Sequence, residues 1–292
     1  MKRALIVGCG YTGERLARRL LDTGAVVLGT TRDAERGAEL RRAGIEPSIG
    51  ELDARETLGQ IEKFEPELVA YFVPPRDDGT DPLLTKVLTA TRLPLEAFLY
   101  ASSTSIYGNR DGAWVDETTA IRPEDAPGSR HSCERLMIEA ARDRGMPTRV
   151  CRITGIYGPG RTLRRSLESG RYVLIDGHDT WVSRIHVDDL VTGLIAAWQH
   201  GEAGGLYNIV DDEPHRASEF ARLAARLHGL AEPAVISEAE ARERLSESRF
   251  RRKLTNKRVR SIRLKQELGV DLEYPTYRVG LPAAVEAERG RS

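Results

Sequence analysis

The sequence predicts an α/β protein built on a doubly wound parallel sheet, with a smaller C-terminal α/β lobe. Two observations indicate this fold. Short apolar runs alternate with helical stretches over the first 160 residues, and a glycine-rich turn joins the first apolar run to the first helical stretch. Continuous apolar runs between helices are typical of strands that are covered on both faces, as in parallel sheets.

The expected strands of the first half share an apolar, β-branched composition. They cover residues 4–8, 26–32, 68–74, 97–103 and 148–153. The helical stretches between them read GERLARRLLDTG, RGAELRRAG, PLLTKVLTAT and PGSRHSCERLMIEAAR. In the last of these, at 127–142, apolar residues recur at i, i+3, i+4, i+7 and i+8, which predicts one buried helix face. Right-handed crossovers between such strands produce a doubly wound sheet.

The alternation is looser after residue 159. We expect a helix over 186–200, a strand over 205–210, and a helix in RASEFARLAARLHGL with Ser218 as its N-cap. The stretch SEAEARERLSESRFRRKLTNKRVRS is helical at its start and then basic. We interpret it as a solvated face of the lobe, with a phosphate-binding patch as the alternative.

Composition limits the classes of partner. The formal net charge is zero, which argues against nucleic acid or a membrane surface, and the sequence holds no run of 18 apolar residues. Three scattered cysteines make neither a disulfide framework nor a metal-binding pattern. We therefore expect a cytoplasmic protein without a metal site. The chain has 6 lysines against 38 arginines, and no lysine lies between Lys86 and Lys253.

Gly8, Gly10 and Gly13 have G-x-G-x-x-G spacing directly after the first strand and directly before the first helix. In this context each glycine has a separate role. The first makes the tight turn, the second lets the backbone approach a pyrophosphate, and the third lets the helix pack on the strand. The helix N-terminus offers free N–H groups to the phosphates. The loop therefore predicts a dinucleotide cofactor.

The end of the second strand bears on which dinucleotide is bound. An NAD site has an acidic residue about 20 positions after the loop, whereas this strand ends with Thr31 and Arg32. Hydroxyl and guanidinium groups suit a 2′-phosphate, so NADP is the preferred cofactor. Asp33 follows directly and keeps NAD as the alternative.

Three further motifs accompany the glycine loop: YASSTSIYGN after a strand, RITGIYGPGR after the next, and RIHVDDL later. With these motifs the chain resembles the extended short-chain dehydrogenase/reductase family, the NAD-dependent epimerase/dehydratase group. The resemblance implies a Rossmann domain over 1–158, to which the helix at 186–200 and the strand at 205–210 return. Residues 159–185 and 211–285 would then form the substrate lobe. It also implies a homodimer, through the helix of the PGSRHSCERLMIEAAR stretch and its predecessor.

The resemblance implies site residues as well. Ser103 matches the family's catalytic Ser/Thr, whose hydroxyl binds a substrate oxygen during hydride transfer. The implied cofactor residues beyond the glycines, Thr31 and Arg32 are Tyr11, Thr12, Asp53, Val73, Pro74, Ser102, Arg130 and Thr154. The candidate substrate residues are Tyr107, Tyr157, Arg161 and Arg184.

The chain departs from the family at the proton-transfer pair Tyr-x-x-x-Lys. None of its nine tyrosines has a lysine four residues later. One register puts Arg130 at the lysine position and Ala126 at the tyrosine position, where the arginine can hold the cofactor ribose but cannot usefully lose a proton. The other register puts Arg135 and His131 there, and His131 is then a candidate general acid/base. A kept glycine loop without the pair resembles the atypical members of the group.

Two more departures concern the substrate. Gly155 stands where nucleotide-sugar enzymes of the family have asparagine, and Val182 where they have arginine. Both lost groups help to seat a sugar diphosphate, so a small carbonyl or hydroxyl compound, with an anionic one favoured, is the expected substrate. The favoured function is an NAD(P)-dependent oxidoreductase, epimerase or dehydratase. The alternatives are a non-catalytic NADP(H) sensor and a structural subunit of a larger complex.

Overall fold

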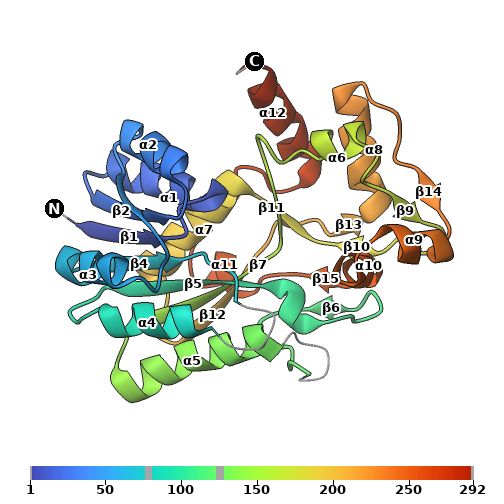
Figure 1. Cartoon of the computed structure of the whole chain (residues 1–292). Coiled ribbons are helices and arrows are strands. Elements are labelled where there is room, and N and C mark those ends of the chain that lie inside the picture. Colours follow the sequence, from blue (N-terminus) through green and yellow to red (C-terminus); the bar gives the residue numbers. More distant parts are fainter. Residues whose placement is uncertain (1, 76–80, 123–127, 291–292) are drawn as a thin grey trace.

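The computed structural model describes residues 2–75, 81–122 and 128–290. Its centre is a seven-stranded sheet in the order β12-β7-β5-β4-β1-β2-β3, and all the neighbouring pairs are parallel (Figure 1). The strands are β1 (Arg3–Val7), β2 (Val26–Thr31), β3 (Glu46–Ile49), β4 (Leu68–Tyr71), β5 (Ala97–Ser103), β7 (Thr148–Ile153) and β12 (Gly205–Ile209). The strand order reverses between β1 and β4, as in a doubly wound sheet. The predicted fold class is confirmed.

Helices cover both faces of this sheet, because alternate residues of each inner strand point to opposite sides. Ala4 and Ile6 of β1 belong to one core cluster, whereas Leu5 and Val7 belong to another. The first cluster includes residues of α1 (Tyr11–Asp22), α2 (Ala34–Arg42) and α7 (Val187–His200). The second includes residues of α3 (Arg55–Phe64), α4 (Pro82–Ala90) and α5 (Gly128–Arg144). Figure 1 shows the two helical layers on either side of the sheet.

The strand β3 and the helix α3 are missing from the sequence-based expectation. β3 reads Glu-Pro-Ser-Ile and lies at the edge of the sheet, where it pairs with β2. An edge strand is open to solvent on one side. Its sequence therefore lacks the continuous apolar run that marks the inner strands.

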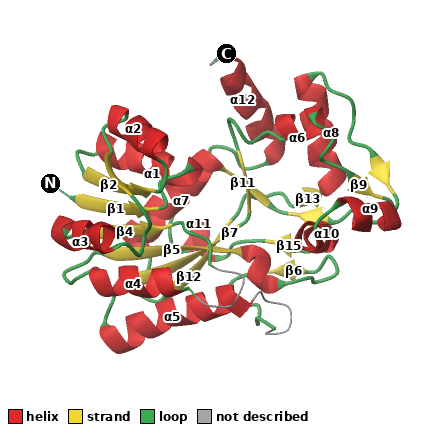
Figure 2. Ribbon diagram, in the orientation of Figure 1, coloured by secondary structure: helices red, strands yellow, loops and turns green. Residues whose placement is uncertain are grey.

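The second lobe consists of short strands and helices beside the sheet (Figure 2). Two elements that follow β5 take part in it or lie next to it, the 3-10 turn η1 (Thr104–Tyr107) and β6 (Trp114–Val115). The others are β8 (Gly155–Tyr157), α6 (Arg164–Glu168), β9 (Leu174–Ile175), β10 (Trp181–Val182), β11 (Arg184–His186), β13 (His215–Arg216), α8 (Ala217–His228), β14 (Val235–Ile236), α9 (Glu238–Arg244), α10 (Glu247–Leu254), β15 (Arg258–Val259) and α12 (Tyr277–Arg289). In contrast, α11 (Arg263–Gln266) packs on the central sheet, since Leu264 belongs to the first core cluster. Pairing of β15 with β6 ties the C-terminal part of the chain to the segment after β5.

The predicted N-cap of the RASEFARLAARLHGL helix is wrong. α8 begins at Ala217 with Arg216 as its N-cap, so Ser218 lies inside the first turn. The carboxylate of Asp179 accepts the backbone N–H of Ser218 at 3.0 Å and its hydroxyl at 2.7 Å. A carboxylate from a distant segment therefore satisfies the free N–H group at this helix start.

Candidate active site

The glycine loop between β1 and α1 forms an open cradle. Gly8 has a φ of +82°, and its N–H donates to the hydroxyl of Thr30 at 2.9 Å. A Cβ on Gly13 would lie 2.9 Å from the carbonyl oxygen of Gly8, so only glycine lets α1 approach β1 this closely. A Cβ on Gly10 would meet nothing within 4 Å, and α1 has no side-chain hydrogen bond at its N-cap. This space and these backbone groups fit the pyrophosphate of a dinucleotide.

The structure brings several of the expected cofactor residues to this loop. Val73 lies against Gly8, because a Cβ there would be 3.2 Å from Val73 Cγ2, and exposed Pro74 follows it. The Tyr11 hydroxyl donates to the carbonyl oxygen of Pro159 at 3.0 Å. The guanidinium of Arg161 lies 4.1 Å from the Tyr11 ring centroid, so this expected substrate residue is at the start of α1. Thr12 is buried in the first turn of α1.

Arg36, at the start of α2, makes a contact with the glycine loop that the sequence did not predict. The Nη2 atom of Arg36, in the first turn of α2, donates to the carbonyl oxygen of Cys9 in the loop at 3.3 Å. The carboxylate of Asp33 caps α2, since it accepts the N–H of Arg36 at 3.0 Å. Arg32 is exposed and has no hydrogen bond or ion pair with the described residues, and Thr31 Oγ1 accepts the N–H of Asp33 at 3.3 Å. The position of Arg36, a basic residue at the start of the second helix, could have indicated this contact from the sequence.

Ser102 and Tyr107, two of the expected site residues, lie in a buried polar network and not in a cavity wall. Ser102 Oγ donates to Glu134 at 2.5 Å, and Glu134 also binds the guanidinium of Arg152 at 2.7 Å. Arg152 Nη1 donates to the Tyr107 hydroxyl at 3.0 Å, which itself donates to Asn208 at 2.8 Å. All these side chains are buried, and mutual hydrogen bonds compensate the loss of hydration. The network joins β5, α5, β7 and β12.

The start of α5, where the family's missing pair would lie, contributes neither of its candidates to the cavity. His131 is exposed. Arg130 is half-buried, and its positive charge acts on the Cys133 thiol. Neither side chain lines the cavity described below. Arg135 pairs with Glu139 at 3.4 Å on the exposed side of the helix. Ala126 lies outside the described residues.

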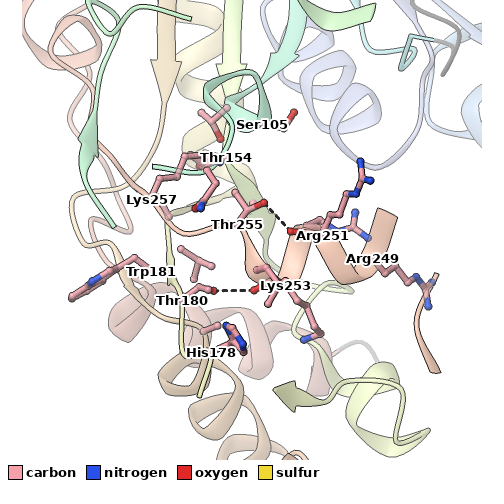
Figure 3. Close-up of a pocket in the computed structure, with 18 of the residues that line it drawn as sticks. Ser105, Thr154, His178, Thr180, Trp181, Arg249, Arg251, Lys253, Thr255 and Lys257 are labelled. Carbon is pink, nitrogen blue, oxygen red and sulfur yellow. Dashed lines mark hydrogen bonds between the residues drawn. The ribbon is translucent and has the colours of Figure 1, made fainter. Parts of the chain in front are cut away.

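A cavity of about 1170 Å³ lies between the carboxyl ends of β5 and β7 and the second lobe (Figure 3). Strand-end residues Ser103, Thr154 and Gly155 line it on one side. Ser103 Oγ accepts the N–H of Ser105 at 3.2 Å, and Thr154 Oγ1 donates to the carbonyl oxygen of Ile209 at 3.1 Å. Ligands of open α/β sheets bind outside the carboxyl ends of the strands.

The lining of this cavity is strongly cationic. Its cationic side chains are Arg171, Arg184, Arg249, Arg251, Arg252, Lys253 and Lys257, and no aspartate or glutamate is among the described residues that line it. Burial, with a smaller contribution from neighbouring guanidinium groups, lowers the pKa of Lys253 and of Lys257 to about 8. Lys253 Nζ donates to the carbonyl oxygen of Val173, and Lys257 Nζ donates to that of Gly108 at 3.1 Å.

Arg249, Arg251 and Arg252 are exposed, as a solvated face predicts, but that interpretation of the basic stretch is wrong for Lys253 and Lys257. α10 and the segment after it fold back against the strand ends, so Lys253 and Lys257 are mostly buried. Arg184 also lines the cavity, with its guanidinium 3.8 Å from the Phe220 ring centroid and its buried Nε without a partner in the described chain. Tyr157 is fully buried between His186 and Phe220 and does not line the cavity.

The remaining expectations concern Asp53, metal binding and membrane spans. Asp53 is exposed and pairs with Lys86 at 3.5 Å. No group of three or more His, Cys, Asp and Glu side chains able to hold a metal ion occurs in residues 2–75, 81–122 and 128–290. In the same ranges, the helices are too short or too polar to cross a membrane.

Known proteins are similar to this chain over most of its length. Protein YeeZ of Escherichia coli K12 is 28% identical over 292 residues, an alignment that covers 94% of this chain and 97% of that protein. A 4-hydroxy-2-methyl-3-oxo-4-farnesyl-3,4-dihydroquinoline-1-oxide ketoreductase of Stigmatella aurantiaca is 26% identical, in an alignment that covers 90% of this chain and 85% of that protein. The solved structure of a functionally unknown conserved protein from Silicibacter pomeroyi DSS is 33% identical, with a TM-score of 0.82 and coverage of 98% and 99%.

The resemblance drawn from the four sequence motifs is confirmed by a family model. The model of the NAD dependent epimerase/dehydratase family matches residues 4–210, which include the glycine loop, the ends of β5 and β7, and α7. The chain belongs to the NAD-dependent epimerase/dehydratase family.

Proposed function

We propose that this protein is an NADP-dependent enzyme that carries out redox, epimerase or dehydratase chemistry on a small anionic carbonyl or hydroxyl compound. The observation that carries the proposal is the cavity at the strand ends, which has seven cationic side chains and no described carboxylate in its lining. Arg251 pairs with Glu247 at 2.7 Å, whereas the other six cations have no ion pair with the described residues. These six repel one another, and the buried Lys257 also loses hydration. An anionic ligand removes both penalties, so the cavity favours such a ligand.

The glycine loop supports cofactor binding by this chain's own groups. The N–H groups at the start of α1 would bind the pyrophosphate, and Val73 would lie beside it. A bound nicotinamide dinucleotide supplies or accepts the hydride. Ser103 would donate its hydroxyl hydrogen to the reacting oxygen of the substrate, because its own oxygen already accepts the N–H of Ser105.

The preference for NADP over NAD is part of the proposal. The carboxylate of Asp33 caps α2, which leaves it engaged with the backbone, while Arg32 has no partner in the described chain. Arg36 also lies beside the loop, but its guanidinium is paired with Glu14 and Glu39. Titration of the protein with NADPH and NADH, followed by cofactor fluorescence, tests the preference. We expect tighter binding of NADPH that is reduced by Arg32→Ala, and equal affinities for the two cofactors would contradict it.

The main alternative is a non-catalytic sensor of the NADP(H) pool. Loss of the Tyr-x-x-x-Lys pair with retention of the glycine loop is what such a protein would show. A sensor, however, needs no cavity for a second ligand, and the cavity beside Ser103 is large and lined by seven cationic side chains. The cavity therefore favours the enzyme.

A panel of carbonyl compounds tests the proposed function. The panel pairs each anion with an uncharged analogue, for example dihydroxyacetone phosphate with dihydroxyacetone and acetoacetate with acetone. Absorbance at the NADPH band and proton NMR of the compound together detect reduction, epimerisation and dehydration. We expect turnover of anionic members and much weaker turnover of their uncharged analogues. Cofactor binding without turnover of any member would favour the sensor, and a preference for the uncharged analogues would contradict the anionic substrate.

A further inference from the structure

Lys257 lies in the wall of the cavity that also contains Ser103. Its side chain is buried, with 9% of the residue exposed, in the segment between α10 and β15. Nζ donates one hydrogen bond, to the carbonyl oxygen of Gly108 at 3.1 Å. Gly108 ends the 3-10 turn η1, and Ser103 is the N-cap of the same turn. Lys257 is thus tied to the segment that presents the Ser103 hydroxyl.

The surroundings of this ammonium group differ from those of a structural lysine. An ammonium has three donors, and one of them has a partner in the described chain. No described carboxylate pairs with Nζ, and the charged group that acts most on it is the guanidinium of Arg110. The other charged side chains that line the cavity, among them Arg184 and Lys253, are also cationic. A buried cation without a counter-ion costs stability, which a neutral donor to Gly108 would avoid.

Lys253 shares the cavity but has a different position. Its Nζ donates to the carbonyl oxygen of Val173 and lies 4.1 Å from the Tyr172 ring centroid, so its contacts are within the second lobe. We assign it to anion binding, together with the arginines of α10. The two lysines therefore lie against different parts of the cavity wall.

We propose that Lys257 is the proton donor and acceptor of this active site, in place of the tyrosine that the chain lacks. The proposal rests on the proposed function above. Its geometric basis is the shared cavity wall, the hydrogen bond to Gly108 and the ammonium hydrogens that remain without partners. Arginine cannot take this role, because it does not lose its proton near neutral pH. The pKa of Lys257 near 8 suits exchange at neutral pH.

In the reducing direction, a bound reduced nicotinamide would supply a hydride to the carbonyl carbon of the substrate, and the C=O double bond would become a single bond. The carbonyl oxygen takes a proton from the Lys257 ammonium, so an N–H bond breaks and an O–H bond forms. The substrate is reduced, the nicotinamide is oxidised, and the neutral amine is reprotonated by solvent. The oxidising direction reverses each change, with the neutral amine as the base.

A direct titration of the lysine provides a test that does not depend on turnover. Protein labelled with ¹³C at the lysine Cε position gives six signals, because the chain has 6 lysines. The signal that disappears in Lys257→Gln belongs to Lys257. We expect its chemical shift to titrate with a midpoint near 8. A midpoint near the ordinary lysine value of about 10.4 would overturn the proposal.

Kinetics of substituted proteins provide the second test, with a substrate found on the carbonyl panel. Lys257→Gln keeps a donor for Gly108, and Lys257→Arg keeps the positive charge. We expect both to lower kcat by about 100-fold or more and to remove the limb of the pH–rate profile near pH 8, while NADPH binds as in the wild type. Lys63→Gln, on the exposed end of α3, is the surface control. Lys253→Gln should instead raise KM for the anion.

The two proposals fail in different ways. Wild-type turnover that survives in Lys257→Gln and Lys257→Arg with the pH profile unchanged would overturn the role of Lys257 alone. Lack of wild-type turnover on the whole panel would overturn the proposed enzyme function and this role with it. Thermal unfolding curves that match the wild type would show that a loss of activity is not a loss of fold.

Discussion

Single side chains at the strand ends are oriented by backbone groups before any ligand arrives. Ser103 Oγ accepts a backbone N–H, which fixes the oxygen and leaves its hydrogen available to a ligand. Thr154 Oγ1 instead donates to the carbonyl oxygen of Ile209, so its hydrogen is already used. At the scale of the residue, Ser103 is therefore the better donor to a substrate oxygen of these two hydroxyl groups.

The Ser103→Ala substitution should lower kcat by about 100-fold, because a positioned donor to the developing oxyanion is worth roughly 10²–10³ in rate. The Kd for NADPH should not change, since Ser103 lies outside the glycine loop. Steady-state kinetics and a cofactor titration measure the two quantities. Thr89→Ala, on the exposed face of α4, is a control for removal of a hydroxyl. An unchanged kcat in Ser103→Ala would remove Ser103 from the mechanism.

In the unit formed by β1, the glycine loop and α1, Gly13 should matter for stability and Gly10 for cofactor binding. Gly13→Ala should destabilise the fold by about 1–3 kcal/mol, because its Cβ would lie 2.9 Å from both the Gly8 carbonyl oxygen and Ile6 Cγ2. Gly10→Ala should cost less than about 1 kcal/mol, since its Cβ meets nothing within 4 Å. It should nevertheless abolish tight NADPH binding, because the Cβ would occupy the space above the loop.

Thermal unfolding and cofactor titration of the two glycine variants check this separation. The expected pattern is a lowered Tm for Gly13→Ala, and a near wild-type Tm with weakened NADPH binding for Gly10→Ala. Wild-type affinity in Gly10→Ala would show that the cofactor does not lie over this part of the loop.

His215, in the aromatic core of the second lobe, should make the free energy of unfolding depend on pH. His215 packs against Phe220 and Tyr277, with ring centroids 5.4 and 4.2 Å apart, and its Nε2 has no described partner. Burial lowers the pKa of His215 to about 3, and the Arg184 guanidinium contributes in the same direction. The unfolded chain has the ordinary value near 6.5. Between these values the unfolded state binds more protons, so the stabilising contribution is complete above pH 6.5 and is lost as the pH falls.

Urea unfolding at pH 7.5 and at pH 5.0 measures this effect. Wild-type protein should lose up to about 1.4 kcal/mol more per pH unit below 6.5 than His215→Gln does, because one additional proton is taken up on unfolding. His200→Gln, at the exposed end of α7, is the matched control and should keep the wild-type slope. Equal slopes in wild type and His215→Gln would mean that His215 does not titrate on unfolding.

In the whole molecule, the cavity exists because C-terminal segments fold back against the ends of β5 and β7. Ser103 belongs to the central sheet, whereas Arg249, Arg252 and Lys257 come from the C-terminal segment. The pairing of β6 with β15 and the hydrogen bond from Lys257 to Gly108 hold these parts together. Asp189 adds another link, since its carboxylate accepts the N–H groups of Glu273 and Tyr274 at 2.8 and 2.9 Å.

The charge of this cavity predicts a salt dependence. Replacement of Arg249 and Arg252 together by glutamine should raise KM for an anionic substrate about tenfold, which corresponds to roughly 1.4 kcal/mol, with little change in kcat. Higher ionic strength should raise KM for the wild type more than for the double variant, because salt screens partly exposed charges. Arg244→Gln on α9, outside the cavity lining, is the control. Equal salt dependence in wild type and double variant would contradict this role of α10.

Much of the fold could be predicted because its signals are local. The inner strands are continuous apolar runs, and the glycine spacing sits between one of them and a helix. β3 escaped prediction because an edge strand of the sequence Glu-Pro-Ser-Ile has no such run. The N-cap of α8 escaped for a different reason. Asp179, which satisfies that helix start, lies 39 residues away from Ser218 in the sequence.

The glycine loop is the part of the candidate site whose geometry follows from the sequence. Gly8 has the expected positive φ and Gly13 the expected close approach of α1 to β1, while the role of Gly10 in cofactor binding stays a prediction. Tyr107 and Tyr157, expected near the substrate, are instead fully buried: Tyr107 in the polar network with Arg152, and Tyr157 among aromatic rings. A tyrosine after a strand has the same local sequence in both situations, so the direction of its side chain depends on what packs over it.

The parallel α/β core, the glycine loop and the absence of the Tyr-x-x-x-Lys pair follow from the sequence alone, since each is a matter of residue type at a fixed spacing. Which charges line the cavity depends on how the chain folds. Lys257 lies 149 residues from Gly108 in the sequence, and its ammonium is nevertheless 3.1 Å from the Gly108 carbonyl oxygen. A basic stretch is equally compatible with a solvated surface and with a cavity wall. Burial and long-range contacts distinguish them, and these arise only when the chain folds back on the sheet.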